Sequence, residues 1–96
     1  MNRELSLDPQ PAVDLHQLVE HIGTRDDFVL FARALLDDLQ RHPAEWENRT
    51  VGDYLEAIGA WTDDMDGYFR NRGEAVQAEP SWKLFGKILL AAKVYE

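Results

Sequence analysis

The 96-residue sequence contains no cysteine. This absence excludes a disulfide framework, a thiolate metal site and a cysteine nucleophile, and it fits a reducing cytoplasm, where we expect the protein to reside. Only Ser6 and Ser81 are serines, and no glycine-rich phosphate loop is present. The sequence therefore shows no catalytic signature. We predict that the protein is not an enzyme and that it carries no cofactor or resident metal.

Long apolar runs are also missing. The longest covers residues 88–92, far short of the roughly 20 residues that a membrane-spanning helix needs. The first residues, MNRELSLDPQPAV, lack the apolar core of a signal peptide. We therefore expect no membrane segment and no leader.

Basic residues are scarce, with 10 Lys and Arg against 18 Asp and Glu, which gives a net charge of −8. The surplus is concentrated in residues 37–66, where nine acidic residues face only two basic ones. Such a field repels nucleic acid and anionic membranes and attracts basic proteins. We expect no nucleic-acid or membrane partner. The acidic segment either binds a basic protein or serves only solubility, and the sequence leaves both open.

Apolar residues recur at helical spacing in four segments. Thr24, Thr50 and Ser81 precede three of them, where helix N-caps stand. The predicted fold is all-α, a compact bundle of four main helices with an extended N-terminal tail. The tail covers residues 1–12, and residues 13–96 form a single helical domain. The predicted helices are residues 13–22, 24–41, 51–70 and 82–95.

The third predicted helix has one broad apolar stripe, which we expect to face the core together with Trp82 of the last helix. Gly59 lies beside this stripe and predicts a close crossing with another helix, since an interior glycine costs about 1 kcal/mol relative to alanine. The stripe consists of Val51, Tyr54, Leu55, Ile58, Trp61, Met65, Tyr68 and Phe69.

The last predicted helix is apolar over most of its circumference. A helix of this kind is buried on several sides, so we place it at the middle of the bundle. An alternative is that Leu90 and Val94 line up with Lys83 and Lys87 as an outer strip that a second subunit covers. The protein would then be a self-associating homodimer that pairs through its C-terminal helix.

Carboxylates gather on the other side of the third helix and near its C-terminal end, where the helix dipole disfavours them. Trp46, in the connector before this helix, has two interpretations. It either docks the connector onto the core or stands among acids as an exposed aromatic anchor, as in protein-binding hot spots. The predicted partner-binding residues are Trp46, Glu47, Asp53, Glu56, Asp63, Asp64 and Asp66.

Metal-binding motifs are weak. His16 and His21 are five residues apart on a helix, so they point roughly 140° away from each other. An EF-hand over residues 62–73 fails because Thr62 would hold the first ligand position and Gly73 the last, which requires glutamate. A surface cation at residues 63–66, with an activity dependent on divalent cations, remains a weaker alternative.

Three short segments together resemble a family of small uncharacterised bacterial domains. They are residues 46–50 (WENRT), 66–71 (DGYFRN) and 80–85 (PSWKLF). The family pattern is W-E-N-x-T, D-G-Y-[YF]-x-N and P-x-W-x-x-F, and the resemblance covers residues 27–96. It implies that the connector at Trp46 and residues 64–71 are family features. The family has no established activity, so the resemblance implies no reaction or ligand.

Charge and the absence of catalytic motifs favour a non-enzymatic interaction module that binds a basic partner. One form of it is an immunity-type or inhibitor-type protein that masks a basic site. The sequence does not identify the partner or the oligomeric state.

Overall fold

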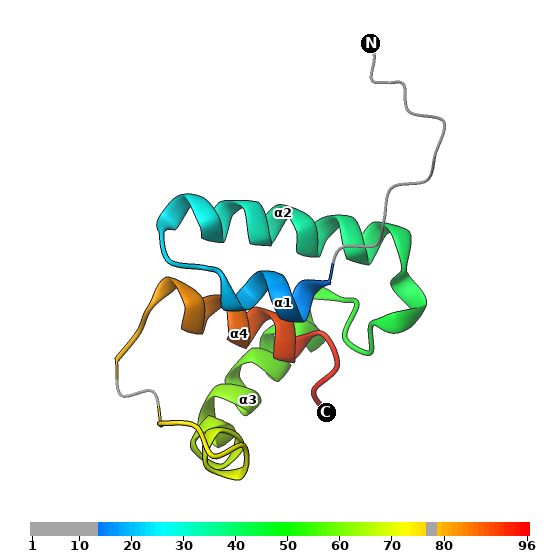
Figure 1. Cartoon of the computed structure of the whole chain (residues 1–96). Helices are drawn as coiled ribbons and strands as arrows, with labels where there is room; N and C mark the ends of the chain where they lie inside the picture. The colour runs from blue at the N-terminus through cyan, green and yellow to red at the C-terminus, as the bar shows by residue number, and fades with distance from the viewer. Residues whose placement is uncertain (1–13, 77–78) are drawn as a thin grey trace.

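The computed structural model of the chain describes residues 14–76 and 79–96 (Figure 1). This part of the chain forms four α-helices and no strand, so the predicted all-α fold with four main helices is confirmed. The predicted tail, residues 1–12, lies outside the described residues. The helices are α1 (Leu15–Glu20), α2 (Arg25–Arg41), α3 (Val51–Asn71) and α4 (Trp82–Ala92), with a short 3-10 turn, η1 (Pro43–Glu45), between α2 and α3.

The predicted N-caps are confirmed. The side chain of Thr24 accepts a hydrogen bond from the backbone of Asp27, whose carboxylate accepts one from the backbone of Thr24, both at 3.1 Å. This reciprocal capping box satisfies two backbone donors that a helix start leaves open. Thr50 and Ser81 cap α3 and α4 through their hydroxyls. None of the helices in the two described stretches is long and apolar enough to cross a bilayer.

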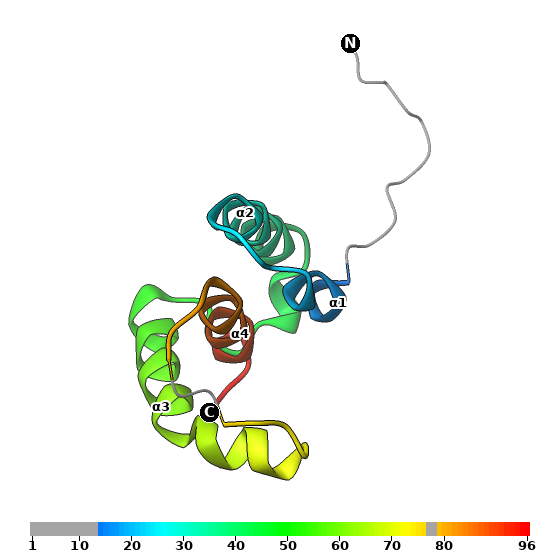
Figure 2. The same ribbon diagram turned by 60° about the vertical axis from the view of Figure 1, so that its left-hand side comes forward.

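Helix α4 occupies the middle of the bundle, as predicted. It contacts α1, α2 and α3, whereas α2 and α3 do not contact each other within the described residues. Figure 2 shows α4 between α2 and α3, with α1 beside it. The core is correspondingly divided into two apolar clusters. One joins α1, α2 and α4, and the other joins α3 and α4 around Trp61, Phe69 and Leu84.

The close helix crossing lies at Gly86 of α4. A Cβ atom there would stand 2.5 Å from Ile22 Cδ1 and 3.1 Å from Val19 Cγ2. The predicted crossing at Gly59 is wrong, because a Cβ at Gly59 would meet nothing within 4 Å. Glycine therefore lets α4 approach the α1 segment, while the outer side of α3 lies open.

The predicted burial of the α3 stripe is only partly correct. Trp61 and Phe69 are buried, but Val51 is 76% exposed and Leu55 is 59% exposed. The reason is that α4 alone covers α3, and one helix does not cover so wide a stripe. Trp82 is also not a core residue, because it is 40% exposed and packs on Phe28 with ring centroids 5.4 Å apart.

The connector between α2 and α3 is tied to the end of α4. The side-chain amide of Asn48 donates to the carbonyls of Ala92 at 2.9 Å and Tyr95 at 2.7 Å. The backbone N–H groups of Glu47 and Asn48 both donate to the carbonyl of Lys93 at 3.1 Å. These bonds satisfy carbonyls that the end of a helix leaves without partners.

Asn48→Ala is expected to lower the free energy of unfolding by about 1 to 3 kcal/mol, because two half-buried carbonyls lose their donor. Urea denaturation followed by circular dichroism measures the change. Asn71→Ala, at the exposed end of α3, is the matched control and is expected to change stability by less than about 0.5 kcal/mol. Equal effects of the two substitutions would contradict the role of Asn48.

Candidate interaction surface

The predicted acidic residues of α3 lie at the surface. Asp53, Glu56, Asp63, Asp64 and Asp66 are all exposed. The ion pairs formed within residues 14–76 and 79–96 use carboxylates of other segments. The negative charge of α3 is therefore not compensated by neighbouring cations of the described chain.

The outer side of α3 is flat as well as acidic. Gly52, Glu56, Gly59, Asp63 and Gly67 follow one another at helical spacing, so they share one side of the helix. A Cβ atom added at any of the three glycines would meet nothing within 4 Å. Gly59 and Gly67 lie inside α3, where each costs the helix about 1 kcal/mol relative to alanine. Packing within the described chain does not account for that cost.

Two of the predicted site residues have partners near the C-terminus. The hydroxyl of Tyr95 donates a hydrogen bond to the carboxylate of Asp64, and this bond raises the pKa of Tyr95. The side chain of Glu47 faces that of Glu96, and the hydrogen bond between the two carboxyls raises the pKa of Glu96. The structure thus places Asp64 and Glu47 beside the last residues of the chain.

Trp46 is a core residue and not an exposed anchor. Only 6% of its surface is exposed, and its indole Nε1 donates to Asp38 Oδ2 at 2.8 Å. Lys93 Nζ lies 2.9 Å from the same oxygen and 5.7 Å from the centre of the indole ring. Burial raises the pKa of Asp38, but the hydrogen bonds from Lys93 and Trp46 outweigh it and hold the pKa below its usual value. Of the two interpretations of Trp46, the geometry matches the one in which this residue docks the connector onto the core.

An apolar groove that the sequence did not predict lies between α2 and α3. Its volume is about 280 Å³, and its lining is mainly apolar. Leu36 of α2 and Val51 of α3 form opposite walls, and Leu89 of α4 lies between them. The groove exists because α2 and α3 both pack on α4 without meeting each other.

The apolar surface continues beyond this groove. Leu55 lies one turn after Val51, and Phe85 lies one turn before Leu89 and packs edge-on against Trp82. We call the exposed side chains of Leu36, Val51, Leu55, Trp82 and Phe85 the open apolar face. Each of these five side chains is between 40% and 76% exposed. Contiguous exposed apolar surface on a small protein often marks an interaction site.

Tyr54 lines the groove with its ring and anchors α3 to α4. Its hydroxyl donates to the carbonyl of Leu89 at 2.7 Å, and burial raises the pKa of Tyr54 to about 12. An unfolded tyrosine loses its proton near pH 10. The contribution of this shift to stability is therefore complete below about pH 10 and is lost as the pH rises through about 12.

The ultraviolet titration of the three tyrosines is expected to contain a component near pH 12 that Tyr54→Phe removes. Between pH 10 and 12 the wild-type protein should lose stability more steeply than the variant. An unchanged titration in Tyr54→Phe would contradict the assignment.

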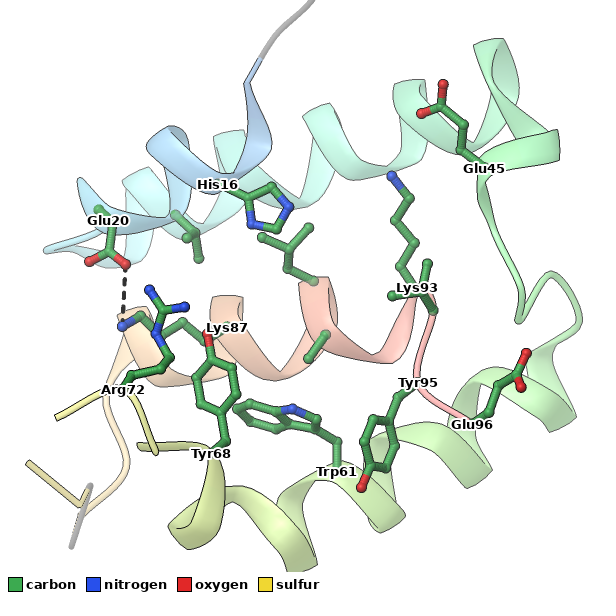
Figure 3. Close-up of a pocket in the computed structure, with 14 residues that line it drawn as sticks. His16, Glu20, Glu45, Trp61, Tyr68, Arg72, Lys87, Lys93, Tyr95 and Glu96 are labelled. Atoms are coloured by element: carbon green, nitrogen blue, oxygen red, sulfur yellow. Dashed lines mark ion pairs between the residues drawn. The ribbon is translucent and has the colours of Figure 1, made fainter. Parts of the chain in front are cut away.

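A larger cavity, of about 770 Å³, lies between α1, α4 and the C-terminal half of α3 (Figure 3). Trp61, Tyr68 and Tyr95 form its aromatic side. Its basic groups are neutralised by the chain itself. Lys87 lies 3.3 Å from Glu20, and Arg72 and Lys93 pair with Glu74 and Asp38. The cavity has the size of a small-molecule site, but each of its lysines and its arginine already has a carboxylate partner.

The geometry gives no support to a cation at residues 63–66. In the part of the chain that the structure describes, no group of three or more His, Asp or Glu side chains is placed to hold a metal ion. Asp63 and Asp64 are about 100° apart around α3, and Asp66 points to yet another direction. These carboxylates share a region of the surface without converging on one point.

Three helices arranged around a central α4, an open apolar face and an acidic outer helix define a small all-α domain. The chain belongs to a family of unknown function, DUF7660, which matches residues 24–96. The predicted resemblance to a family without known function is thus confirmed at that level. No curated protein and no solved structure matches the chain. The match begins at Thr24, the cap of α2, so α1 lies outside it although Val19 and Ile22 belong to the core.

Proposed function

We propose that the protein is a non-enzymatic interaction module that binds a basic partner protein through the outer side of α3. One observation carries the proposal: the carboxylates of α3 are exposed and form no ion pair within the described residues, and they surround glycines with open space above them. A flat acidic surface without internal compensation is complementary to a basic surface.

The charge also favours rapid capture. A net charge of −8 on 96 residues attracts a cationic partner over a Debye length of about 8 to 10 Å at physiological salt. Complementary charges chiefly raise the association rate and select the partner. An inhibitor-like or immunity-like protein, which covers a basic site on another protein, is one concrete form of this function.

The test is a pull-down from a lysate of the source organism at low and high salt. The wild-type protein is compared with Glu56→Gln/Asp63→Asn/Asp66→Asn. A control, Asp26→Asn/Glu45→Gln/Glu79→Gln, removes the same charge from exposed acids outside α3. Mass spectrometry is expected to identify a basic protein that the wild type and the control retain and the α3 variant loses. Its binding should weaken strongly between about 0.05 and 0.5 M salt. Retention by the α3 variant would refute the proposal.

Self-association through α4 is a second candidate, because the open apolar face includes Phe85 and Trp82 of this helix. The strip predicted from sequence does not exist as such, since Leu90 is buried while Val94 is exposed. Two copies of charge −8 repel each other, which opposes this mode. A monomeric mass in light scattering at high micromolar concentration would exclude it.

A further inference from the structure

Three helices expose apolar residues toward one gap. Val51 of α3 and the half-buried Leu89 of α4 line the gap, and the exposed Leu55 and Phe85 lie one helical turn from them on the same two helices. On α2, Leu36 faces the same gap. The backbones of the two walls, α2 and α3, do not approach each other, and α4 lies between them (Figure 2). The gap is therefore a trough with two helical walls and a helical floor.

We infer that this trough is the docking site for an amphipathic helix of the partner protein. The inference rests on the proposed function and names the part of the partner that binds. Side chains that repeat every four residues form ridges that pack into the grooves of another helix, at axis separations of about 8 to 10 Å. A helix laid over α4 would contact both α2 and α3 and cover the open apolar face. Recognition of an amphipathic helix by an apolar groove is a common binding mode.

The charges beside the trough specify the edges of the docked helix. Asp66 lies eleven residues after Leu55, so it stands on the same side of α3 three turns further on. On the opposite wall, Arg33 lies three residues before Leu36 and is exposed. A helix with a basic edge toward α3 and an acidic edge toward α2 matches both walls. The net charge of −8 makes a basic helix a better occupant than a second copy of this chain.

The chain offers a matched pair of variants for the test. Leu55 and Leu30 are each 59% exposed, so replacing either one disturbs packing to a similar degree. Leu55 belongs to the open apolar face, whereas Leu30 lies about 120° around α2 from Leu36 and away from the trough. Leu55→Glu therefore places a charge in the trough, and Leu30→Glu places the same charge outside it.

The probe is a synthetic Leu/Lys peptide of about 18 residues, or five helical turns, with its leucines on one stripe. A scrambled peptide of identical composition, without the stripe, is the control. Calorimetry is expected to show that the striped peptide binds wild type and Leu30→Glu equally and binds Leu55→Glu at least tenfold more weakly. The scrambled peptide should bind wild type at least tenfold more weakly than the striped one. Circular dichroism verifies folding, and Leu36→Glu replaces Leu55→Glu if the latter unfolds.

The remaining outcomes overturn the inference in distinguishable ways. Both peptides could bind the wild type equally, and the variant Glu56→Gln/Asp63→Asn/Asp66→Asn could lose this binding. That result supports the proposed acidic function and shows that the trough is not the docking site. If the striped peptide does not bind, the trough is not a docking site for an amphipathic helix. The pull-down tests separately whether the acidic side of α3 binds a basic protein. If the wild-type protein is a dimer and Leu55→Glu dissociates it, a second copy of the chain occupies the trough and the inference is wrong.

Discussion

Trp46→Ala is expected to lower the free energy of unfolding by about 3 to 5 kcal/mol, the usual cost of removing a large buried aromatic side chain. Trp46 of the connector is almost wholly buried against α2 and α4. The centre of its ring lies 5.8 Å from that of Tyr54. The substitution would leave a cavity and remove the hydrogen bond to Asp38. Denaturant unfolding, followed by circular dichroism because the variant loses a fluorophore, measures the change.

Trp82→Ala is the control, because Trp82 is half exposed and touches chiefly the rings of Phe28 and Phe85. Its expected cost is about 1 kcal/mol. Trp46→Phe keeps most of the ring and loses the indole donor, so it should cost about 1 to 2 kcal/mol even if Trp46→Ala does not fold. A larger cost for Trp82→Ala than for Trp46→Ala would contradict the placement of Trp46 in the core.

Gly86→Ala is expected to destabilise the protein by about 1 to 3 kcal/mol, whereas Gly59→Ala is expected to stabilise it by about 0.5 to 1 kcal/mol. Both glycines lie inside helices, where alanine is intrinsically favoured. The two positions differ in the space available for the added methyl group. The new methyl group at position 86 would clash with Ile22 and Val19, and the latter is a stiff β-branched side chain. At position 59 the methyl group meets solvent.

Thermal unfolding of the two glycine variants shows the difference as melting temperatures that move in opposite directions. A stabilised Gly86→Ala variant would mean that α4 does not approach the α1 segment as closely as the structure shows. A destabilised Gly59→Ala variant would mean that the outer side of α3 is already covered in the free protein.

Local signals made most of the secondary structure predictable. Thr24, Thr50 and Ser81 each stand directly before an apolar periodic segment, and each is an N-cap in the structure. The central position of α4 was also predictable, because an apolar circumference requires several neighbours. Which of two glycines marks a close crossing was not predictable. Gly59 and Gly86 give the same sequence signal, a glycine within an apolar helical segment. Only the packing of distant segments distinguishes them.

The candidate site was predictable to a smaller extent. The exposure of the α3 carboxylates follows from the amphipathic pattern of one helix. The burial of Trp46 depends on Asp38 and Lys93, which lie 8 and 47 residues away in the sequence. The open apolar face depends on the fact that α2 and α3 do not meet, which no local pattern encodes. The width of the apolar stripe on α3 was a sequence signal for this face, because the stripe is wider than one neighbouring helix covers.

Amide chemical-shift mapping of the isotope-labelled protein, titrated with the basic protein recovered in the pull-down, tests the central claim most directly. The account predicts that the largest shifts map to the open apolar face, at Leu36, Val51, Leu55 and Phe85, and to the acidic outer side of α3. Shifts confined to the cavity around Tyr68 and Lys87, with α3 carboxylate positions unchanged, would contradict it.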